Sequence, residues 1–142
     1  MYPYEHILDE QGAIKRATDP DQALASLKRS AGFPMPADYL NFLRHYAGFE
    51  GAIGGQYLRL EDVEEVLETN EGYEVQRRLP RTLMIGSNGG GEFIAIVYME
   101  DTQGYKIVLS PFADMDERYH LWIGNTFSDF LGRLEKGMGW FD

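Results

Sequence analysis

The 142-residue chain carries a formal net charge of −10 and contains no cysteine, while 44% of its residues are hydrophobic. A chain this apolar is expected to form one packed domain, and its acidity disfavours binding to nucleic acid or to anionic membrane surfaces. The lack of cysteine excludes disulfides, thiol catalysis and cysteine-held iron–sulfur clusters.

The first residues show no targeting pattern. Residues 1–6 lack a basic segment followed by an apolar one, and no run approaches the roughly 18 apolar residues that span a membrane. We therefore expect a cytoplasmic protein.

Two helices are predicted in the first third of the chain. The first begins at Asp19-Pro20, an N-cap candidate followed by proline at the first helical position, and ends at Gly32. The second runs from Pro36 to about Gly48, and its apolar residues recur at the i, i+3, i+4, i+7 spacing of one helix face. These apolar residues are Tyr39, Phe42, Leu43 and Tyr46.

The middle of the chain is predicted to contain a loop, a strand and a short helix. Residues 49–55 are glycine-rich and predict a loop, whereas residues 56–60 alternate like a half-buried strand. Residues 61–68 begin with acidic side chains, which favour the positive end of a helix dipole. Their apolar residues Val63, Val66 and Leu67 share one helix face.

The second half of the chain is rich in predicted strands. Residues 82–85, 93–99 and 105–109 predict an antiparallel meander, and residues 119–123 a short edge strand. Thr126 is a candidate cap for a last helix with the apolar stripe Phe127, Phe130, Leu131 and Leu134. The expected fold is α+β: an antiparallel or mixed sheet of about five strands, with helices from both ends of the chain packed on it.

A glycine-rich stretch, GSNGGGE at residues 86–92, joins two of these strands. It predicts a structural turn in which glycines supply positive φ and let backbones pack closely. A phosphate-binding loop would need a lysine and a Ser or Thr after its last glycine, and then a helix, but Glu92 and a strand follow. The turn residues are Gly86, Gly89, Gly90, Gly91 and Glu92.

Residue spacing indicates no catalytic, cofactor or metal site. His6, His45 and His120 are too far apart for a helical metal motif, and Ser87 is not followed by the helix of a nucleophile elbow. A site in which the fold brings the three histidines together is still an alternative. A hydrolase whose site is assembled by the fold is a third possibility, which a buried cluster joining Glu92 to a histidine would favour.

The segment from residue 50 to residue 74 is strongly acidic, with Arg59 as its only base. Its carboxylates allow two interpretations: a solvated helix face, or a docking patch that attracts a basic partner over roughly 8 Å at physiological salt. The candidate partner-binding residues are Glu61, Asp62, Glu64, Glu65, Glu68, Glu71 and Glu74.

Four stretches form a pattern in order: PADYLNFL at residues 36–43, YLRL at 57–60, IGSNGGGE at 85–92 and FSDFL at 127–131. Their order and spacing, over about residues 20–135, resemble the SUKH superfamily. That superfamily includes the domain of the fungal cell-wall-assembly regulator and of many bacterial immunity proteins. Residues 47–50 depart from the Asn-Gly-Gly-like turn that usually follows the helix there.

The resemblance implies a single α+β domain over residues 1–142 and a non-enzymatic, protein-binding role. For bacterial members it implies neutralisation of a toxin, often a nuclease or deaminase, and an acidic chain suits such a basic partner. The resemblance implies no catalytic residue and no cofactor. The alternative is a regulatory or scaffold domain that binds a cellular protein, or a small ligand near the glycine-rich turn.

Overall fold

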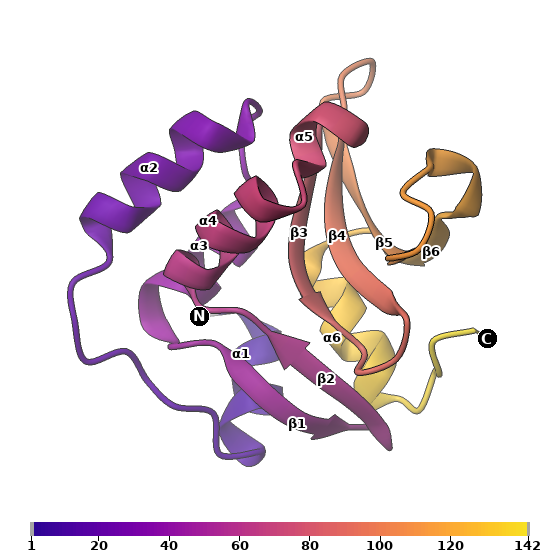
Figure 1. The fold of residues 1–142 in the computed structure, drawn as a ribbon. Helices are drawn as coiled ribbons and strands as arrows, with labels where there is room; N and C mark the ends of the chain where they lie inside the picture. Colours follow the sequence, from indigo (N-terminus) through magenta and orange to yellow (C-terminus); the bar gives the residue numbers. More distant parts are fainter. Residues whose placement is uncertain (1, 142) are drawn as a thin grey trace.

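The structure, a computed structural model, describes residues 2–141. At its centre is an antiparallel β-meander (Figure 1). Its strands lie side by side in chain order, and each neighbouring pair is antiparallel. They are β1 (Phe49–Ile53), β2 (Gln56–Leu60), β3 (Thr82–Ser87), β4 (Glu92–Met99), β5 (Gly104–Pro111) and β6 (Leu121–Gly124). The predicted α+β class is confirmed, with an antiparallel rather than a mixed sheet.

Helices precede, interrupt and follow the meander. They are α1 (Pro3–Glu10), α2 (Asp21–Ala31), α3 (Ala37–His45), α4 (Val63–Gly72), α5 (Val75–Arg78) and α6 (Phe127–Glu135), with a short 3-10 helix η1 (Glu117–Tyr119) before β6. Figure 1 shows α5 and α6 on opposite sides of the strands. Within residues 2–141, no helix has both the length and the apolar character needed to cross a bilayer.

Most of the predicted elements are present, with shifts of one to four residues at their ends, the largest at the end of α4. Gly32 adopts φ +77° and ends α2 as predicted, and Thr126 caps α6 by accepting a hydrogen bond from the Asp129 N–H at 2.9 Å. Asp19 lies one residue further from its helix than predicted, and its carboxylate accepts from the Asp21 N–H. The short helices α1 and α5 were not predicted.

The prediction of a loop over residues 49–55 is wrong. Residues 49–53 form β1, which pairs with β2 along its whole length. Gly54 and Gly55 have φ values of +58° and +85°, so the two-residue connection has the backbone that a tight hairpin requires. Gly51 lies within the strand itself, where glycine is rare, and this explains why the stretch resembled a loop.

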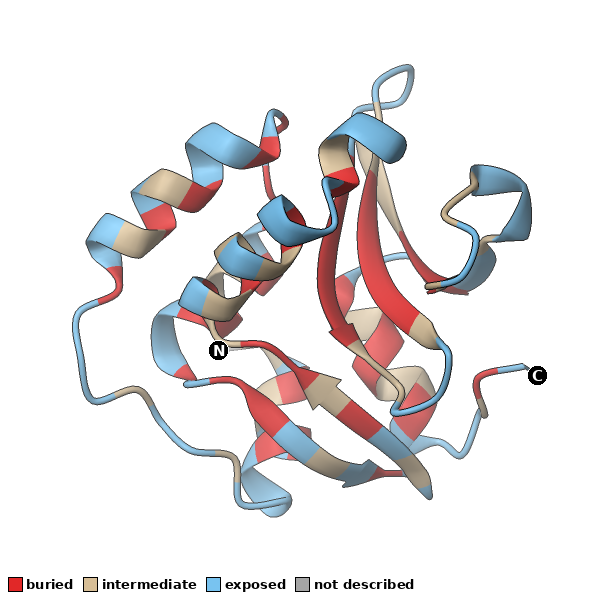
Figure 2. Cartoon of the chain, viewed as in Figure 1, coloured by how far each residue is buried: buried red, intermediate tan, exposed pale blue. Residues whose placement is uncertain are grey.

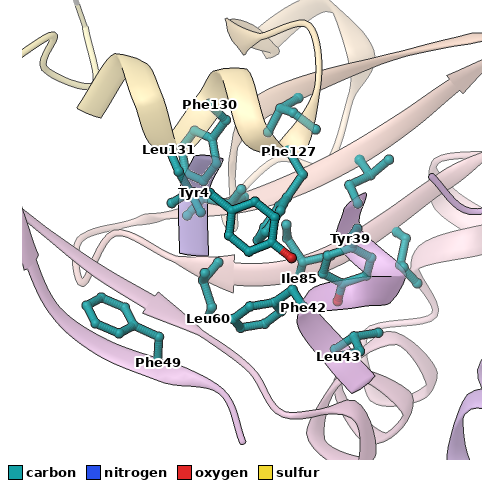
Figure 3. Close-up of a cluster of buried hydrophobic side chains, with 14 of the residues drawn as sticks. Tyr4, Tyr39, Phe42, Leu43, Phe49, Leu60, Ile85, Phe127, Phe130 and Leu131 are labelled. Carbon is teal, nitrogen blue, oxygen red and sulfur yellow. The ribbon is translucent and has the colours of Figure 1, made fainter. Parts of the chain in front are cut away.

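The larger core lies between one face of the sheet and the helices. Rings from three helices meet there: the Phe127 centroid lies 5.1 Å from that of Tyr4 and 5.3 Å from that of Phe42. Figure 3 shows these rings packed with Tyr39, Leu60 and Ile85. Each such fully buried side chain favours folding by about 1.5–3 kcal/mol.

A smaller core covers the other face of the sheet. Val75 of α5 and Leu79, which directly follows that helix, pack there with Met84 of β3 and Phe93 of β4. Because successive side chains of a strand point to opposite faces, β3 and β4 supply both cores and are buried on both sides (Figure 2).

A buried carboxylate joins two helices that are far apart in the sequence. Asp38, 9% exposed, accepts hydrogen bonds from the Tyr39 N–H (2.8 Å) and from the N–H (2.9 Å) and hydroxyl (3.0 Å) of Ser128. One side chain therefore satisfies orphan donors at the beginning of both α3 and α6. Asp38 and Ser128 belong to two of the stretches that carry the SUKH resemblance, so part of that pattern is structural.

Candidate interaction surface on helix α4

Helix α4 carries most of the predicted acidic segment, and its first turn is tightly held. The Asp62 carboxylate accepts from the Val63 N–H at 2.7 Å, while the Glu65 carboxylate accepts from the Asp62 N–H at 3.2 Å. This reciprocal capping fixes where the helix begins. Arg16, from the segment between α1 and α2, adds an ion pair to Asp62, and its side chain is only 8% exposed. The Asp62 carboxylate is therefore satisfied by contacts within the chain.

The underside of α4 is anchored by a buried amide. The Asn70 side chain donates to the carbonyls of Val66 and Met84 at 2.8 Å, and its oxygen accepts from the Met84 N–H at 2.9 Å. Strand β2 pairs with β3 only at Gly86 and Ser87, so the edge of β3 at Met84 lacks a strand partner there. Asn70 supplies the missing hydrogen bonds and holds the helix against the strand.

One arginine serves two carboxylates at the beginning of α4. The Arg59 guanidinium lies 3.5 Å from Glu61 and also pairs with Glu65. Glu61 is only 8% exposed and accepts from the Thr69 hydroxyl at 2.8 Å. Burial raises the pKa of Glu61, because the charged carboxylate loses its hydration. Glu61 and Glu65 thus form a cluster that holds β2 to α4.

The outward face of α4 carries unpaired acids. Glu64, Glu68 and Glu71 follow the i, i+4, i+7 spacing and are exposed, as the outer surface of α4 in Figure 2 shows. Within residues 2–141 none of the three takes part in an ion pair. Glu74, just beyond the helix, is bonded to Arg77 at 2.7 Å. The α4 acidic face is therefore Glu64, Glu68 and Glu71.

An open cavity of about 250 Å³ lies beside the first turn of α4. Its walls include Glu50 of β1, Arg59 of β2 and Glu65 of α4, facing residues 11–14 of the α1–α2 segment. Ile14 in that segment is 71% exposed. The cavity combines an apolar wall with the Glu50 carboxylate and the Arg59–Glu65 ion pair, a setting that suits a lysine or arginine side chain with its aliphatic stem.

The glycine-rich turn has different requirements at each position. A Cβ on Gly86 would lie 2.1 Å from the Arg59 carbonyl oxygen, so only glycine allows β3 to approach β2 this closely. Gly89 has φ +79°, whereas nothing lies within 4 Å of a Cβ built on Gly91. A Cβ on Gly90 would lie 3.4 Å from side-chain oxygens of Asn88 and Glu92, which is ordinary contact. Glu92 accepts a hydrogen bond from the Asn88 side-chain amide at 3.0 Å.

The histidines do not converge. His6 pairs with Glu10 at 2.8 Å, and the Nδ1 atom of His45 lies 3.0 Å from a backbone carbonyl in its own helix. Among residues 2–141, no group of three or more acidic or histidine side chains is placed to hold a metal ion. His120 and Glu92 line one open cavity of about 400 Å³, but no hydrogen bond or ion pair joins them within the described chain.

Comparison with protein families identifies the chain. Residues 20–133, from the start of α2 into α6, match the SMI1 / KNR4 family (SUKH-1). The chain belongs to this family. A comparison with curated proteins gave no match. The SUKH-1 family has immunity and regulatory roles and is generally non-catalytic.

Two contacts that hold the acidic segment within this SUKH-1 chain could not be predicted from the sequence. Arg16 pairs with Asp62, 46 residues away in the sequence, and Asn70 binds Met84 of β3, 14 residues away. Neither residue belongs to a local motif, so no spacing in the sequence indicates these contacts. Residues 47–50, where the pattern departs from the usual family turn, contain Gly48 at φ +76° and the first two residues of β1.

Proposed function

We propose that this SUKH-1 chain is a non-enzymatic binding module that neutralises a basic toxin, of the nuclease or deaminase type, as an immunity protein. The observation that carries the proposal is the α4 acidic face, whose carboxylates have no cationic partner within the described chain. Proteins that act on nucleic acid need Lys and Arg where the phosphates bind. A surface of unpaired carboxylates can occupy or flank such a site.

The rigidity of α4 supports this role. Capping by Asp62 and Glu65, together with the Asn70 anchor, holds the helix in one position relative to β3. A fixed array of charges loses little conformational freedom on binding and accelerates encounter with an oppositely charged surface. The net charge of −10 acts in the same direction over longer distances.

The cavity beside α4 extends this surface. We infer that a lysine or arginine of the partner reaches Glu50 at this cavity, with its stem against Ile14, while Glu65 stays paired with Arg59. The cavity is lined by separate segments that meet at the first turn of α4. A Glu50→Gln variant should therefore weaken binding, and a Glu135→Gln variant, on exposed α6 surface, should leave it unchanged.

Co-expression tests the function directly. The wild-type chain should rescue the growth of cells that express its cognate toxin, and the candidates to test are any toxins encoded in neighbouring reading frames. A Glu64→Lys/Glu68→Lys variant should lose this protection, while Glu100→Lys/Glu135→Lys, with the same change in net charge at exposed sites elsewhere, should keep it. Failure of the wild-type chain with every neighbouring toxin, with no protein co-purifying, would contradict the proposal. Equal loss in both variants would show that net charge, not the α4 acidic face, matters.

A further inference from the structure

The two edges of the sheet are protected to different degrees. Strand β1 buries both of its large apolar residues, Phe49 and Ile53, and exposes Glu50, a charge that discourages pairing with another strand. Strand β6 has the sequence Leu-Trp-Ile-Gly and contains neither a charged residue nor proline. It pairs with β5 on one side, and no strand among residues 2–141 pairs with its other side.

Large apolar side chains gather around this open edge. Leu121 and Trp122 of β6 are 44% and 46% exposed, and because adjacent strand residues point to opposite faces they lie on either side of the edge. Leu121 shares a cavity of about 400 Å³ with Tyr119 and Phe141. Trp122 shares one of about 310 Å³ with Met138. We call these residues the β6 edge patch: Tyr119, Leu121, Trp122, Met138 and Phe141.

The arginines near the β6 edge patch are already neutralised. Arg118 pairs with Asp116 at 2.8 Å, and Arg133 pairs with Asp129 at 3.1 Å while its guanidinium lies 4.1 Å from the centre of the Trp122 ring. On the α4 acidic face, by contrast, the carboxylates have no such partners. The patch therefore offers a basic toxin little attraction, and its paired charges present little repulsion to another acidic chain.

The apolar area sets the strength of any contact made here. Aromatic side chains offer about 150–250 Å² each, and leucine and methionine less, so five that are roughly half exposed expose at most on the order of 500 Å². Two such patches brought together would bury about 1,000 Å², which is near the lower limit for a specific interface. A contact must therefore cover the whole patch on both partners to reach that limit.

We propose that the β6 edge patch binds a second copy of this chain. The two β6 strands pair antiparallel about a two-fold axis and continue the sheet from one copy into the other. Such an isologous contact places each patch against itself and satisfies the open backbone groups of both edges. The dimer is weak, because β6 has only four residues and the apolar area is small. This proposal concerns a surface other than α4 and does not depend on the immunity role.

Sedimentation of the purified full-length chain over a range of protein and NaCl concentrations tests the proposal. The wild-type chain should form a concentration-dependent dimer that does not weaken as salt rises, because salt screens the repulsion between two copies of charge −10. Leu121→Lys should weaken dimerisation at least about tenfold. Phe141→Lys should do the same outside the sheet, so its effect cannot be attributed to a misfolded strand.

Ile14→Lys is the matched control. Ile14 is 71% exposed and lies in the α1–α2 segment, and the substitution makes the same change of charge and polarity as Leu121→Lys. It should leave the dissociation constant of the dimer unchanged. A wild-type chain that is monomeric at every concentration and salt would overturn the proposal, as would a dimer that Leu121→Lys and Phe141→Lys weaken no more than Ile14→Lys does.

Discussion

Helix α4 and strand β6 both lie at the periphery of the fold, but they are held and exposed in opposite ways. Helix α4 is fixed from below by buried polar groups, Asn70 above all, and presents carboxylates to solvent. Strand β6 is fixed by pairing with β5 and by Ile123 in the larger core, and presents apolar side chains. A charged surface on a rigid support suits attraction at a distance, whereas an uncharged edge acts only on contact.

The most severe expected change breaks the support of α4. In Gly86→Ala the new Cβ would lie 2.1 Å from the Arg59 carbonyl oxygen, so β2 and β3 must separate beside α4. The free energy of unfolding should fall by about 3 kcal/mol or more. Chemical denaturation measures this loss. Gly91→Ala is the control in the same turn and should change stability by less than about 0.5 kcal/mol. Equal effects of the two substitutions would contradict the close approach at Gly86.

Loss of the buried amide should come next. Asn70→Ala leaves the Met84 N–H and C=O without partners in a buried position, which should lower the free energy of unfolding by about 2–3 kcal/mol. The matched control lies beside β6, where the exposed Asn125 accepts from the Trp122 indole at 3.1 Å. Asn125→Ala should cost less than about 1 kcal/mol. A small effect of Asn70→Ala would mean that α4 is held by its apolar contacts alone.

Salt should separate the two surfaces by the sign of its effect. Raising NaCl from about 0.05 M to 0.5 M shortens the screening length severalfold. The affinity for a basic partner should then fall about tenfold or more, mainly through slower association. Dimerisation through the β6 edge patch should stay constant or strengthen. Surface plasmon resonance measures the affinity for the basic partner, and sedimentation measures dimerisation. If both equilibria change in the same direction as salt rises, the two surfaces do not differ in the way expected.

The smallest expected effect is a pH dependence beside β6. Burial lowers the pKa of His120, although Glu117 and Asp116 oppose this shift and Lys106 adds to it. The unfolded chain therefore binds more protons than the folded chain below the ordinary histidine pKa of about 6.5. Stability contributed by neutral His120 is present above that pH and should be lost as pH falls towards the folded pKa. Denaturation of His120→Gln from about pH 7.5 to 5 should show a shallower decline than wild type; an equal slope would contradict this assignment.

Much of the fold followed from local patterns. The apolar spacing of Tyr39, Phe42 and Leu43 predicts α3, and the bulky runs on both sides of the glycine-rich stretch predict β3 and β4. These signals succeed because a helix face or a strand must match its own hydrophobic period whatever it packs against. The missed β1 had its signal masked by Gly51 within the strand and by Gly54 and Gly55 after it. A hairpin and a loop both use glycines such as Gly54 and Gly55, because glycine tolerates positive φ.

The sequence by itself determined the α+β class, the family pattern and the excess of acid in the middle of the chain, because each depends only on residue types and their order along the chain. Only the tertiary structure decided which acids are free. Glu61 is buried, Asp62 pairs with Arg16, and Glu65 pairs with Arg59. The exposed carboxylates of α4 without an ion-pair partner among the described residues are Glu64, Glu68 and Glu71. The tertiary structure also left Leu121 and Trp122 at an open edge, since strand order and side-chain partners arise from contacts between distant segments.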